Sequence, residues 1–407
     1  MIIKKLACLI ATLFSLPLLA GLGNAYIANS LSNDVSVVDT ATNTVIGTIG
    51  VGGSPTDVTL TPDGTKAYVP NFDDNTVSVI DTSSNFVIAI IGVGEEPDGA
   101  TTTPDGKQVY IANGMSENIS IIDTATDAVV GTIAVGEGPQ DVDFTPDGKK
   151  AYVANFVTNN VSVIDTSTAT VIATITAGTG PEYVTVSPDG TRAYVSNDGT
   201  ADVFVIDTNT DTVLTTISVG TSPRDIAFTL DGKKAYVTNF GDSNVSIIDT
   251  STNMVIGTIM VGTMPLGVAL SPDGTKLYVM NFTPDTFSVI NTQTDTVIDS
   301  GSSPTSPIAI AFSFARLSSR AQAKKDEFLT QTELFNFLSW TPAPIVPATY
   351  EIFRGVNATE FIGSVPGNTT EFIDHNRVKG EFNSYFIFGK SADGAILSIG
   401  RAAAKTE

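Results

Sequence analysis

Five carboxylates recur at similar places in this sequence, and carboxylate oxygens are the ligands that hard cations prefer. Asp57, Asp98, Asp141, Glu182 and Asp225 each follow closely after a proline, and these prolines are spaced 42 residues apart. If the fold brings the five side chains around one axis, they could hold Ca²⁺ or another hard cation, which needs several oxygen ligands. The alternative is that they are solvated charges that keep the protein soluble.

The same positions in the last two repeats carry apolar residues, Leu266-Gly267 and Ile308-Ala309. A cation site would therefore be lopsided, with an apolar wall opposite its carboxylates. Such a wall is typical of small-molecule pockets.

Other site chemistry is excluded by the residues that the sequence lacks. The sole histidine, His375, stands outside the repeats beside Asp374. The sole cysteine, Cys8, lies in the N-terminal residues 1–23, which we interpret below as a signal peptide. A Ser-His-Asp triad within the repeats and a histidine-ligated metal or haem therefore cannot form. A mature chain without cysteine also has no disulfide and no thiol catalysis. We expect no catalytic residue and no resident cofactor, with Ca²⁺ as the one candidate ion.

The element that must position these side chains is a repeat of 42 residues. Tyrosines mark each copy and are followed by Val or Ile, one variable residue and Asn: Tyr26, Tyr68, Tyr110, Tyr152, Tyr194, Tyr236 and Tyr278. Turns such as Pro62-Asp63-Gly64 separate short alternating runs of β-branched residues, for example Lys66 to Asn71 and Thr76 to Asp81. Each repeat is therefore predicted to form four antiparallel strands.

Seven such repeats predict an all-β, seven-bladed β-propeller over residues 24–313, because one four-stranded sheet cannot bury both of its faces alone. The first repeat enters at Tyr26 without its Pro-containing strand, and the last such strand, Ser306 to Ser313, follows the seventh repeat. We expect this late strand to complete the first blade and close the ring.

The motif Tyr236-Val237-Thr238-Asn239, its six cognates and their Pro-Asp-Gly and Ile-Asp-Thr companions resemble the YVTN family of β-propellers. The resemblance covers roughly residues 24–313. It differs from WD40 repeats, since the only tryptophan, Trp340, lies outside the repeats. Membership would imply the propeller fold and an extracytoplasmic setting, without one particular activity.

The N-terminal residues 1–23 read as a signal peptide. Lys4 and Lys5 precede an apolar run from Leu6 to Ala20, and small residues follow where a signal peptidase could cut. The run is too short for a comfortable membrane span. We expect an exported protein that does not span a membrane and lies in a periplasm, at a cell surface or outside the cell.

After the repeats the composition changes and the 42-residue phase ends. We expect a linker over residues 314–320 and a second domain over residues 321–407. Its short aromatic strands, with Trp340 early and Tyr385 late, resemble a fibronectin type III module, which is a small β-sandwich. In such proteins this module serves spacing or adhesion.

The charge of the chain is concentrated in the propeller. Residues 24–313 contain nine basic and 33 acidic side chains, so they carry the whole formal charge of −24 left after removal of the leader. Eight of the nine basic residues follow the first turn of a repeat, and Arg224 is the exception. One rim should therefore pair Asp with Lys, and the opposite rim should be strongly negative, with loops that vary from copy to copy.

Two classes of function fit this chain of 407 residues. The favoured one is a non-catalytic binding, adhesion or scaffold protein whose acidic, variable rim recognises a basic protein, a cationic surface component or a divalent cation. The alternative is a hydrolase resembling the metal-dependent propeller lactonases, with the five carboxylates as metal ligands. Nucleic acid is excluded as a partner, because phosphate contacts need a basic surface.

Overall fold

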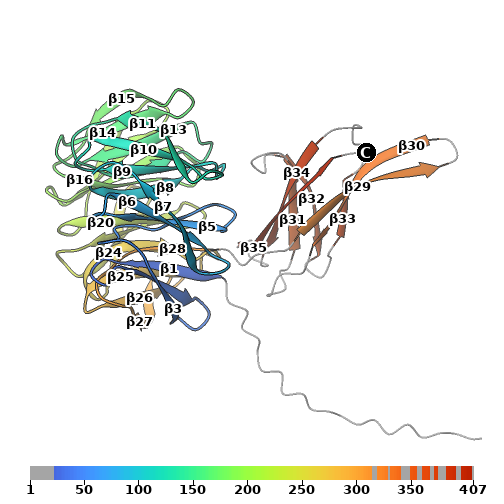
Figure 1. Cartoon of the computed structure of the whole chain (residues 1–407). Coiled ribbons are helices and arrows are strands. Elements are labelled where there is room, and N and C mark those ends of the chain that lie inside the picture. The colour runs from blue at the N-terminus through green and yellow to red at the C-terminus, as the bar shows by residue number, and fades with distance from the viewer. Residues whose placement is uncertain are drawn as a thin grey trace, which may run out of the picture.

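Seven four-stranded antiparallel sheets form the main body of the protein (Figure 1). The computed structural model describes residues 23–313 fully and, beyond them, the backbone of seven strands between residues 319 and 405. No helix occurs within residues 23–313. The prediction of an all-β, seven-bladed propeller is confirmed.

Each blade follows one strand order from the channel outward. Blade 1 contains β28 (Pro307–Phe312), β1 (Asn24–Asn29), β2 (Asp34–Asp39) and β3 (Thr44–Gly50). Blade 2 contains β4 (Thr59–Leu60), β5 (Lys66–Asn71), β6 (Thr76–Asp81) and β7 (Phe86–Gly92). Blade 3 contains β8 (Pro97–Thr102), β9 (Gln108–Asn113), β10 (Asn118–Asp123) and β11 (Ala128–Ala134). Blade 4 contains β12 (Pro139–Phe144), β13 (Lys150–Asn155), β14 (Asn160–Asp165) and β15 (Thr170–Thr176).

The remaining blades repeat this pattern. Blade 5 contains β16 (Pro181–Val186), β17 (Arg192–Asn197), β18 (Asp202–Asp207) and β19 (Thr212–Ser218). Blade 6 contains β20 (Pro223–Phe228), β21 (Lys234–Asn239), β22 (Asn244–Asp249) and β23 (Met254–Met260). Blade 7 contains β24 (Thr263–Leu270), β25 (Lys276–Thr283), β26 (Thr286–Asn291) and β27 (Thr296–Ser302).

The ring closes through blade 1, as the sequence predicts. Strand β28, from the end of the repeat region, pairs antiparallel with β1 from its beginning, and Ile27 lies opposite Ile310. This pairing joins segments almost 300 positions apart. The Ser313 hydroxyl also donates a hydrogen bond to the carbonyl of Asn24, 289 positions earlier in the chain. Blade 1 thus holds the two ends of the propeller together.

The core lies between adjacent blades. The seven repeat tyrosines are fully buried, and each packs against side chains of the next blade, as Tyr152 of blade 4 does with Val195 and Ile206 of blade 5. Burial of such large side chains between sheets removes much apolar surface from water. It also explains why a single repeat would not fold alone.

The repeated aspartates of the turns serve the turns themselves. Asp63 accepts hydrogen bonds from Thr61 and Thr65, and Asp81 accepts them from the backbone of Ser83 and Ser84. Asp commonly satisfies turn backbone in this way. These repeated carboxylates are therefore structural.

The C-terminal strands form two further sheets. One has the order β29 (Ser319–Phe328), β30 (Gln331–Trp340) and β33 (Glu371–Asp374); the other has the order β32 (Glu360–Pro366), β31 (Thr349–Arg354), β34 (Phe382–Lys390) and β35 (Ile396–Lys405). Residues 1–22 of the predicted signal peptide, most of the predicted linker and His375 lie outside the described residues. Where the structure is described, it contains no helix with the length and hydropathy of a membrane span.

Candidate functional site

The two rims of the propeller differ in how their charges are satisfied. We call the turn rim the one formed by the first and third turns of each blade, where Lys66 bonds Asp127 of the next blade. We call the acidic rim the opposite one, formed by the blade-to-blade links and the second turns, where the Gly53 N–H bonds Asp74. These contacts place the loops on the rims that the sequence predicts.

Six of the eight cations on the turn rim are paired with carboxylates, whereas Arg192 and Lys276 bond carbonyl and Asn oxygens. Three lysines reach the neighbouring blade, Lys66 to Asp127 (2.6 Å), Lys150 to Asp211 (2.8 Å) and Lys234 to Asp295 (2.6 Å). Three others pair within their own turn, Lys107 with Asp105, Lys149 with Asp147 and Lys233 with Asp231. The predicted pairing of Asp with Lys on this rim is confirmed.

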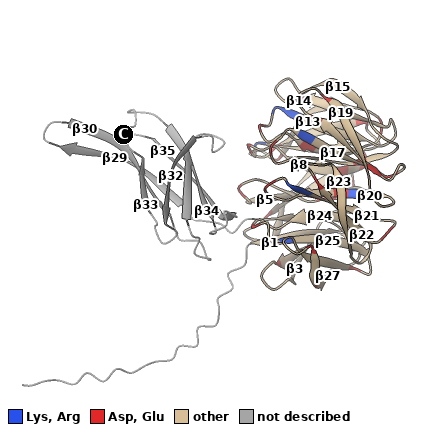
Figure 2. Cartoon of the chain, turned by 180° about the vertical axis from the view of Figure 1, so that it is seen from behind, with Lys and Arg blue, Asp and Glu red and all other residues tan. Residues whose placement is uncertain are grey.

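The acidic rim has one cation, Arg224, among its described residues. Basic segments of the propeller are few among the acidic ones in Figure 2. A surface of this composition carries a negative potential that attracts cationic partners. The carboxylates of this rim are Asp34, Asp57, Asp73, Asp74, Glu95, Glu96, Asp98, Glu117, Glu137, Asp141, Glu182, Asp198, Asp202, Asp225, Asp242 and Asp285.

Apolar side chains are exposed among the carboxylates of this rim at blades 3 and 4. Met115 is 59% exposed and its N–H bonds the carbonyl of Glu95, while Val157 is 58% exposed and its N–H bonds the carbonyl of Glu137. Phe156, next to Val157, is 39% exposed. We call these five residues the mixed patch, because acidic and apolar side chains alternate within it.

The five carboxylates predicted to bind metal occupy two different positions beside the inner strands. Asp57, Asp141 and Asp225 stand two residues after their prolines, in blades 2, 4 and 6, whereas Asp98 and Glu182 stand one residue after theirs, in blades 3 and 5. Successive strand residues point in opposite directions. The two groups therefore meet different neighbours.

The first group links neighbouring blades through backbone N–H groups. The Oδ2 atom of each aspartate accepts a hydrogen bond from a residue 43 positions further on: Ala100 for Asp57 (2.9 Å), Val184 for Asp141 (3.0 Å) and Val268 for Asp225 (2.8 Å). Asp143 of blade 4 makes the same link to Val186 (2.7 Å). We call these four residues the bridging aspartates.

Asp98 differs from the bridging aspartates. No described residue donates a hydrogen bond to its carboxylate, although its backbone carbonyl accepts one from the Thr56 hydroxyl. Burial and then repulsion by Asp57 raise the pKa of Asp98 to about 7, against the attraction of Arg224. The side chain is still partly accessible, so it faces the channel as an unpartnered acid.

The second carboxylate of this group, Glu182, is held by Arg224. The guanidinium of Arg224 forms an ion pair with Glu182, lies 3.8 Å from Asp198 and stacks over the ring of Phe240 at 5.2 Å. Three buried atoms of this cluster, Glu182 Oε2, Asp198 Oδ1 and Arg224 Nε, have no hydrogen-bond partner in the structure. Glu182 is thus committed to an internal ion pair.

Burial raises the pKa of the channel aspartates. Burial raises the pKa of Asp57 and Asp143 to about 6 and that of Asp225 to about 7, although backbone N–H groups oppose the shift. Burial also raises the pKa of Asp141 and of Tyr183, with further contributions from the neighbouring aspartates. All are partly accessible from the channel, so water moderates the penalty of charging them.

The five carboxylates do not gather into a single ligand set. Asp57, Asp141 and Asp225 are close enough to influence one another's pKa, but their oxygens bind backbone N–H groups. Within residues 23–313 no group of three or more acidic, histidine or cysteine side chains is placed to hold a metal ion. The calcium site at Asp57, Asp98, Asp141, Glu182 and Asp225 stays a prediction, without support from this geometry.

Sequence reasoning missed three residues of the channel mouth, Asp143, Tyr183 and Arg224. A signal for Arg224 was present, because it is the one cation of the repeats that stands away from the first turns. The bridging role also had a signal, since Asp recurs two residues after the proline in alternate blades, 84 residues apart.

Comparisons with known proteins agree with the propeller architecture. The YNCE-like β-propeller family model matches residues 136–235. Hydrazine synthase from Kuenenia stuttgartiensis has 26% identity and a TM-score of 0.62, with 66% of this chain and 92% of that chain covered. A protein of unknown function from Desulfotomaculum acetoxidans DSM 771 has 18% identity and a TM-score of 0.64, with 72% and 99% covered.

A proposed 6-phosphogluconolactonase from Bacteroides uniformis ATCC 8492 has 17% identity and a TM-score of 0.63, with 72% of this chain and 100% of that chain covered. No curated protein matches this sequence significantly. The structure resembles 1120 solved chains, and a propeller fold alone does not identify an activity.

Proposed function

We propose that this protein is a binding protein whose acidic rim recognises a basic protein or a cationic component of a cell surface. The observation that carries the proposal is the charge balance of this rim, where many carboxylates share one guanidinium that is already paired with Glu182. The turn rim, by contrast, pairs six of its aspartates with lysines. Attraction of a cationic partner is therefore directed to one face.

The mixed patch gives this face a candidate contact centre. Met115 and Val157 expose apolar surface beside Glu95 and Glu137. A partner that is only charged would leave this apolar surface in contact with water. Protein interfaces combine an apolar centre with a polar surround, and Met and aromatic residues are enriched in them. The partner that fits is a basic segment with interspersed apolar side chains.

The test uses two synthetic peptides, one alternating lysine with leucine and one alternating glutamate with leucine. We expect the lysine peptide to bind the mature protein and the glutamate peptide not to bind. The variant E95Q/E117Q/E137Q should weaken binding, since all three carboxylates are exposed, Glu95 and Glu137 belong to the patch, and Glu117 shares the turn of Met115. The variant D105N/D147N/D231N removes the same charge from the turn rim and should bind normally. Equal weakening by both variants would contradict the proposal.

The alternative is a hydrolase with its reacting groups in the channel. It is favoured by one observation, the group of channel acids with raised pKa values, since such groups cluster at functional sites. A metal-dependent reaction would need the predicted carboxylate ligands. Calorimetric titration of the metal-stripped protein with Ca²⁺ tests this: saturable binding near one site per chain would justify screening lactones and esters. Absence of binding would remove this alternative.

We further propose an exported protein in which residues 1–23 are a signal peptide and residues 321–407 a fibronectin type III-like module. The sequence features that support export are Lys4, Lys5 and the apolar run after them. The module would act as a spacer that presents the propeller. Expression with residues 1–23 intact, followed by fractionation and N-terminal sequencing of the product, tests export and cleavage.

A further inference from the structure

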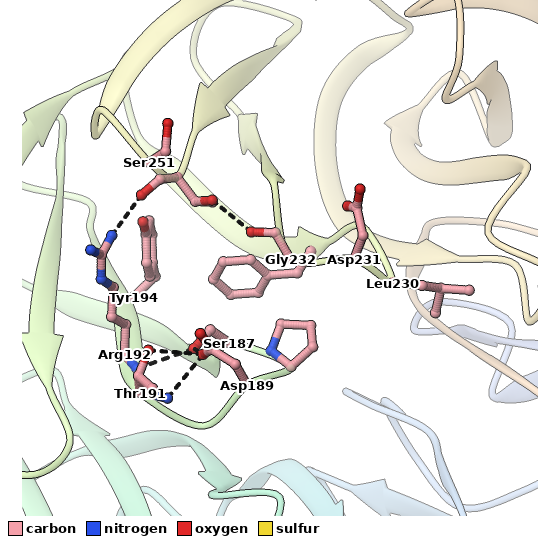
Figure 3. Close-up of a pocket in the computed structure, with 12 residues that line it drawn as sticks. Ser187, Asp189, Thr191, Arg192, Tyr194, Leu230, Asp231, Gly232 and Ser251 are labelled. Carbon is pink, nitrogen blue, oxygen red and sulfur yellow. Dashed lines mark hydrogen bonds between the residues drawn. The ribbon is translucent and has the colours of Figure 1, made fainter. Parts of the chain in front are cut away.

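A cavity of about 450 Å³ lies between blades 5 and 6 on the turn rim, away from the acidic face (Figure 3). Its walls come from the first turn of each of the two blades and from the third turn of blade 6. Pro188, Phe228 and Leu230 supply apolar surface, and Arg192, Asp189 and Asp231 supply charge. The size is in the range of small-molecule pockets.

The cavity contains a cation that lacks the carboxylate partner present in three of the equivalent clefts. Lys66, Lys150 and Lys234 each form an ion pair with an aspartate of the next blade. At this cleft the repeat has Arg192 in place of lysine, and Arg192 meets Asn253, as Lys276 meets Asn43 between blades 7 and 1. The guanidinium therefore keeps its charge without a described carboxylate in ion-pairing contact.

One edge of the Arg192 guanidinium is used by the protein. Its Nη1 atom donates to the carbonyl of Thr250 (2.6 Å) and to Oδ1 of Asn253 (3.2 Å). These bonds fix the plane of the group, whose side chain also bonds the Tyr194 hydroxyl, and no described carboxylate pairs with its Nη2 and Nε edge. A planar edge with two parallel N–H donors fits a carboxylate.

The apolar wall also departs from the repeat. Leu230 occupies the turn position where Pro62, Pro104, Pro146 and Pro188 stand in neighbouring blades, and it is 52% exposed. Phe228, beneath it on β20, packs edge-on against Tyr194 with ring centroids 4.9 Å apart. The changes at Arg192 and Leu230 thus fall on one cleft. A cleft that differs from its symmetry mates at more than one position is the place to expect a ligand.

The two turn aspartates at the cavity are hydrogen-bond acceptors. Asp189 accepts from Ser187 and Thr191, and Asp231 is paired with Lys233 at 3.0 Å. The Lys233 ion pair reduces repulsion between Asp231 and an incoming anion. Carboxylate oxygens in such a position suit the hydroxyl groups of a ligand.

We propose that this cavity binds a small hydroxylated carboxylate of the sugar-acid class. The ligand carboxylate pairs with the free edge of Arg192, its carbon skeleton lies against Phe228 and Leu230, and its hydroxyl groups donate to Asp189 and Asp231. This site lies on the turn rim, so it is separate from the acidic face proposed to bind a basic partner. Both could be occupied at once.

The experiment is calorimetric titration of the mature protein with D-glucuronate, with D-glucose as the ligand control. The informative variant is R192K/N253D, which installs the Lys and Asp pair that the structure already uses between other blades. This variant should fold, because three Lys–Asp ion pairs at equivalent positions already join neighbouring blades. Its lysine would be neutralised by the new aspartate, so the cavity would lose its free cation.

We expect saturable binding of D-glucuronate, at least tenfold weaker binding of D-glucose, and at least a tenfold loss of D-glucuronate affinity in R192K/N253D. The control variant D127N breaks the equivalent Lys66–Asp127 ion pair between blades 2 and 3, and it should bind D-glucuronate with the affinity of the natural protein. The proposal is overturned by absence of saturable D-glucuronate binding, by equal binding of D-glucose, by unchanged affinity in R192K/N253D, or by an equal loss in D127N.

Discussion

The buried hydroxyl of Tyr110 has no hydrogen-bond partner, because Ala169 occupies the position where the other blades place Asp or Asn. In the equivalent contacts Tyr152 donates to Asp211 at 2.6 Å and Tyr194 donates to Asn253 at 3.0 Å. Each of the other repeat tyrosines thus bonds the third turn of the next blade. The tie between blades 3 and 4 is the one that lacks an acceptor.

Ala169→Asn should stabilise the propeller. Asn supplies the missing acceptor for Tyr110, and it tolerates the left-handed backbone of this position, where φ is +52°. We expect a gain of about 1 kcal/mol in the free energy of unfolding, since an unsatisfied buried group costs roughly that much. The measurement is chemical denaturation of both proteins.

Two tyrosine variants provide the control for this prediction. Tyr110→Phe should leave stability unchanged or slightly higher, because its hydroxyl has no partner to lose. Tyr152→Phe should lower stability, because it leaves Asp211 without that donor. Equal losses in the two variants would show that Tyr110 finds an acceptor after all.

Asp98→Asn should raise the melting temperature at pH 8. The pKa of Asp98 is raised from 3.8 to about 7 in the folded protein, so the folded state binds the proton more tightly than the unfolded chain. The stability from this proton is present below about pH 4 and is lost as pH rises toward 7. Between pH 5 and pH 8 the melting temperature of the variant should therefore fall less steeply than that of the natural protein.

Asp81→Asn removes the same charge with the opposite expectation. Bonds from Ser83 and Ser84 lower the pKa of Asp81 to about 2, so its charged form stabilises the fold above the unfolded value of 3.8. That stability is lost only as pH falls toward 2. Asp81→Asn should melt lower at pH 8; a rise like that of Asp98→Asn would show that both changes act through net charge alone.

Arg224→Met should destabilise the propeller by about 3 kcal/mol. Loss of the guanidinium leaves Glu182 and Asp198 without a cation in a largely buried site, and removal of one partner of a buried pair costs roughly 3 to 5 kcal/mol. Water in the channel argues for the lower end. The double variant E182L/R224M should recover most of the loss in denaturation experiments. A double variant as unstable as the single one would contradict this account.

Apolar and charged residues of the mixed patch should affect peptide binding differently. Replacement of Met115 and Val157 by serine removes exposed apolar surface. It should lower the affinity for the lysine peptide by a similar factor at low and high salt. The charge variant E95Q/E117Q/E137Q should weaken it mainly at low salt, because salt screens exposed charges. Titrations at two ionic strengths check both. Identical salt dependence for the two variants would count against the charge-based recognition.

The sequence by itself determined the repeating architecture. The spacing of the seven tyrosines and the alternation of β-branched residues between Pro-Asp-Gly turns are local signals, and local signals specify strands and turns. The displaced strand Ser306 to Ser313 also predicted closure of the ring, which the pairing of β28 with β1 confirms. The assignment of charges to two rims followed from the strand order alone.

Only the tertiary structure decided what the carboxylates of the channel contact. Asp57 and Asp225 reach backbone N–H groups 43 residues away, and Glu182 meets Arg224 of the next blade. Such contacts depend on the stagger and spacing of neighbouring blades, and a one-residue difference after a proline turns a side chain toward another partner. The cavity at Arg192 likewise exists because two blades pack there with different side chains. Sequence periodicity describes one blade at a time, whereas these sites form where two blades meet.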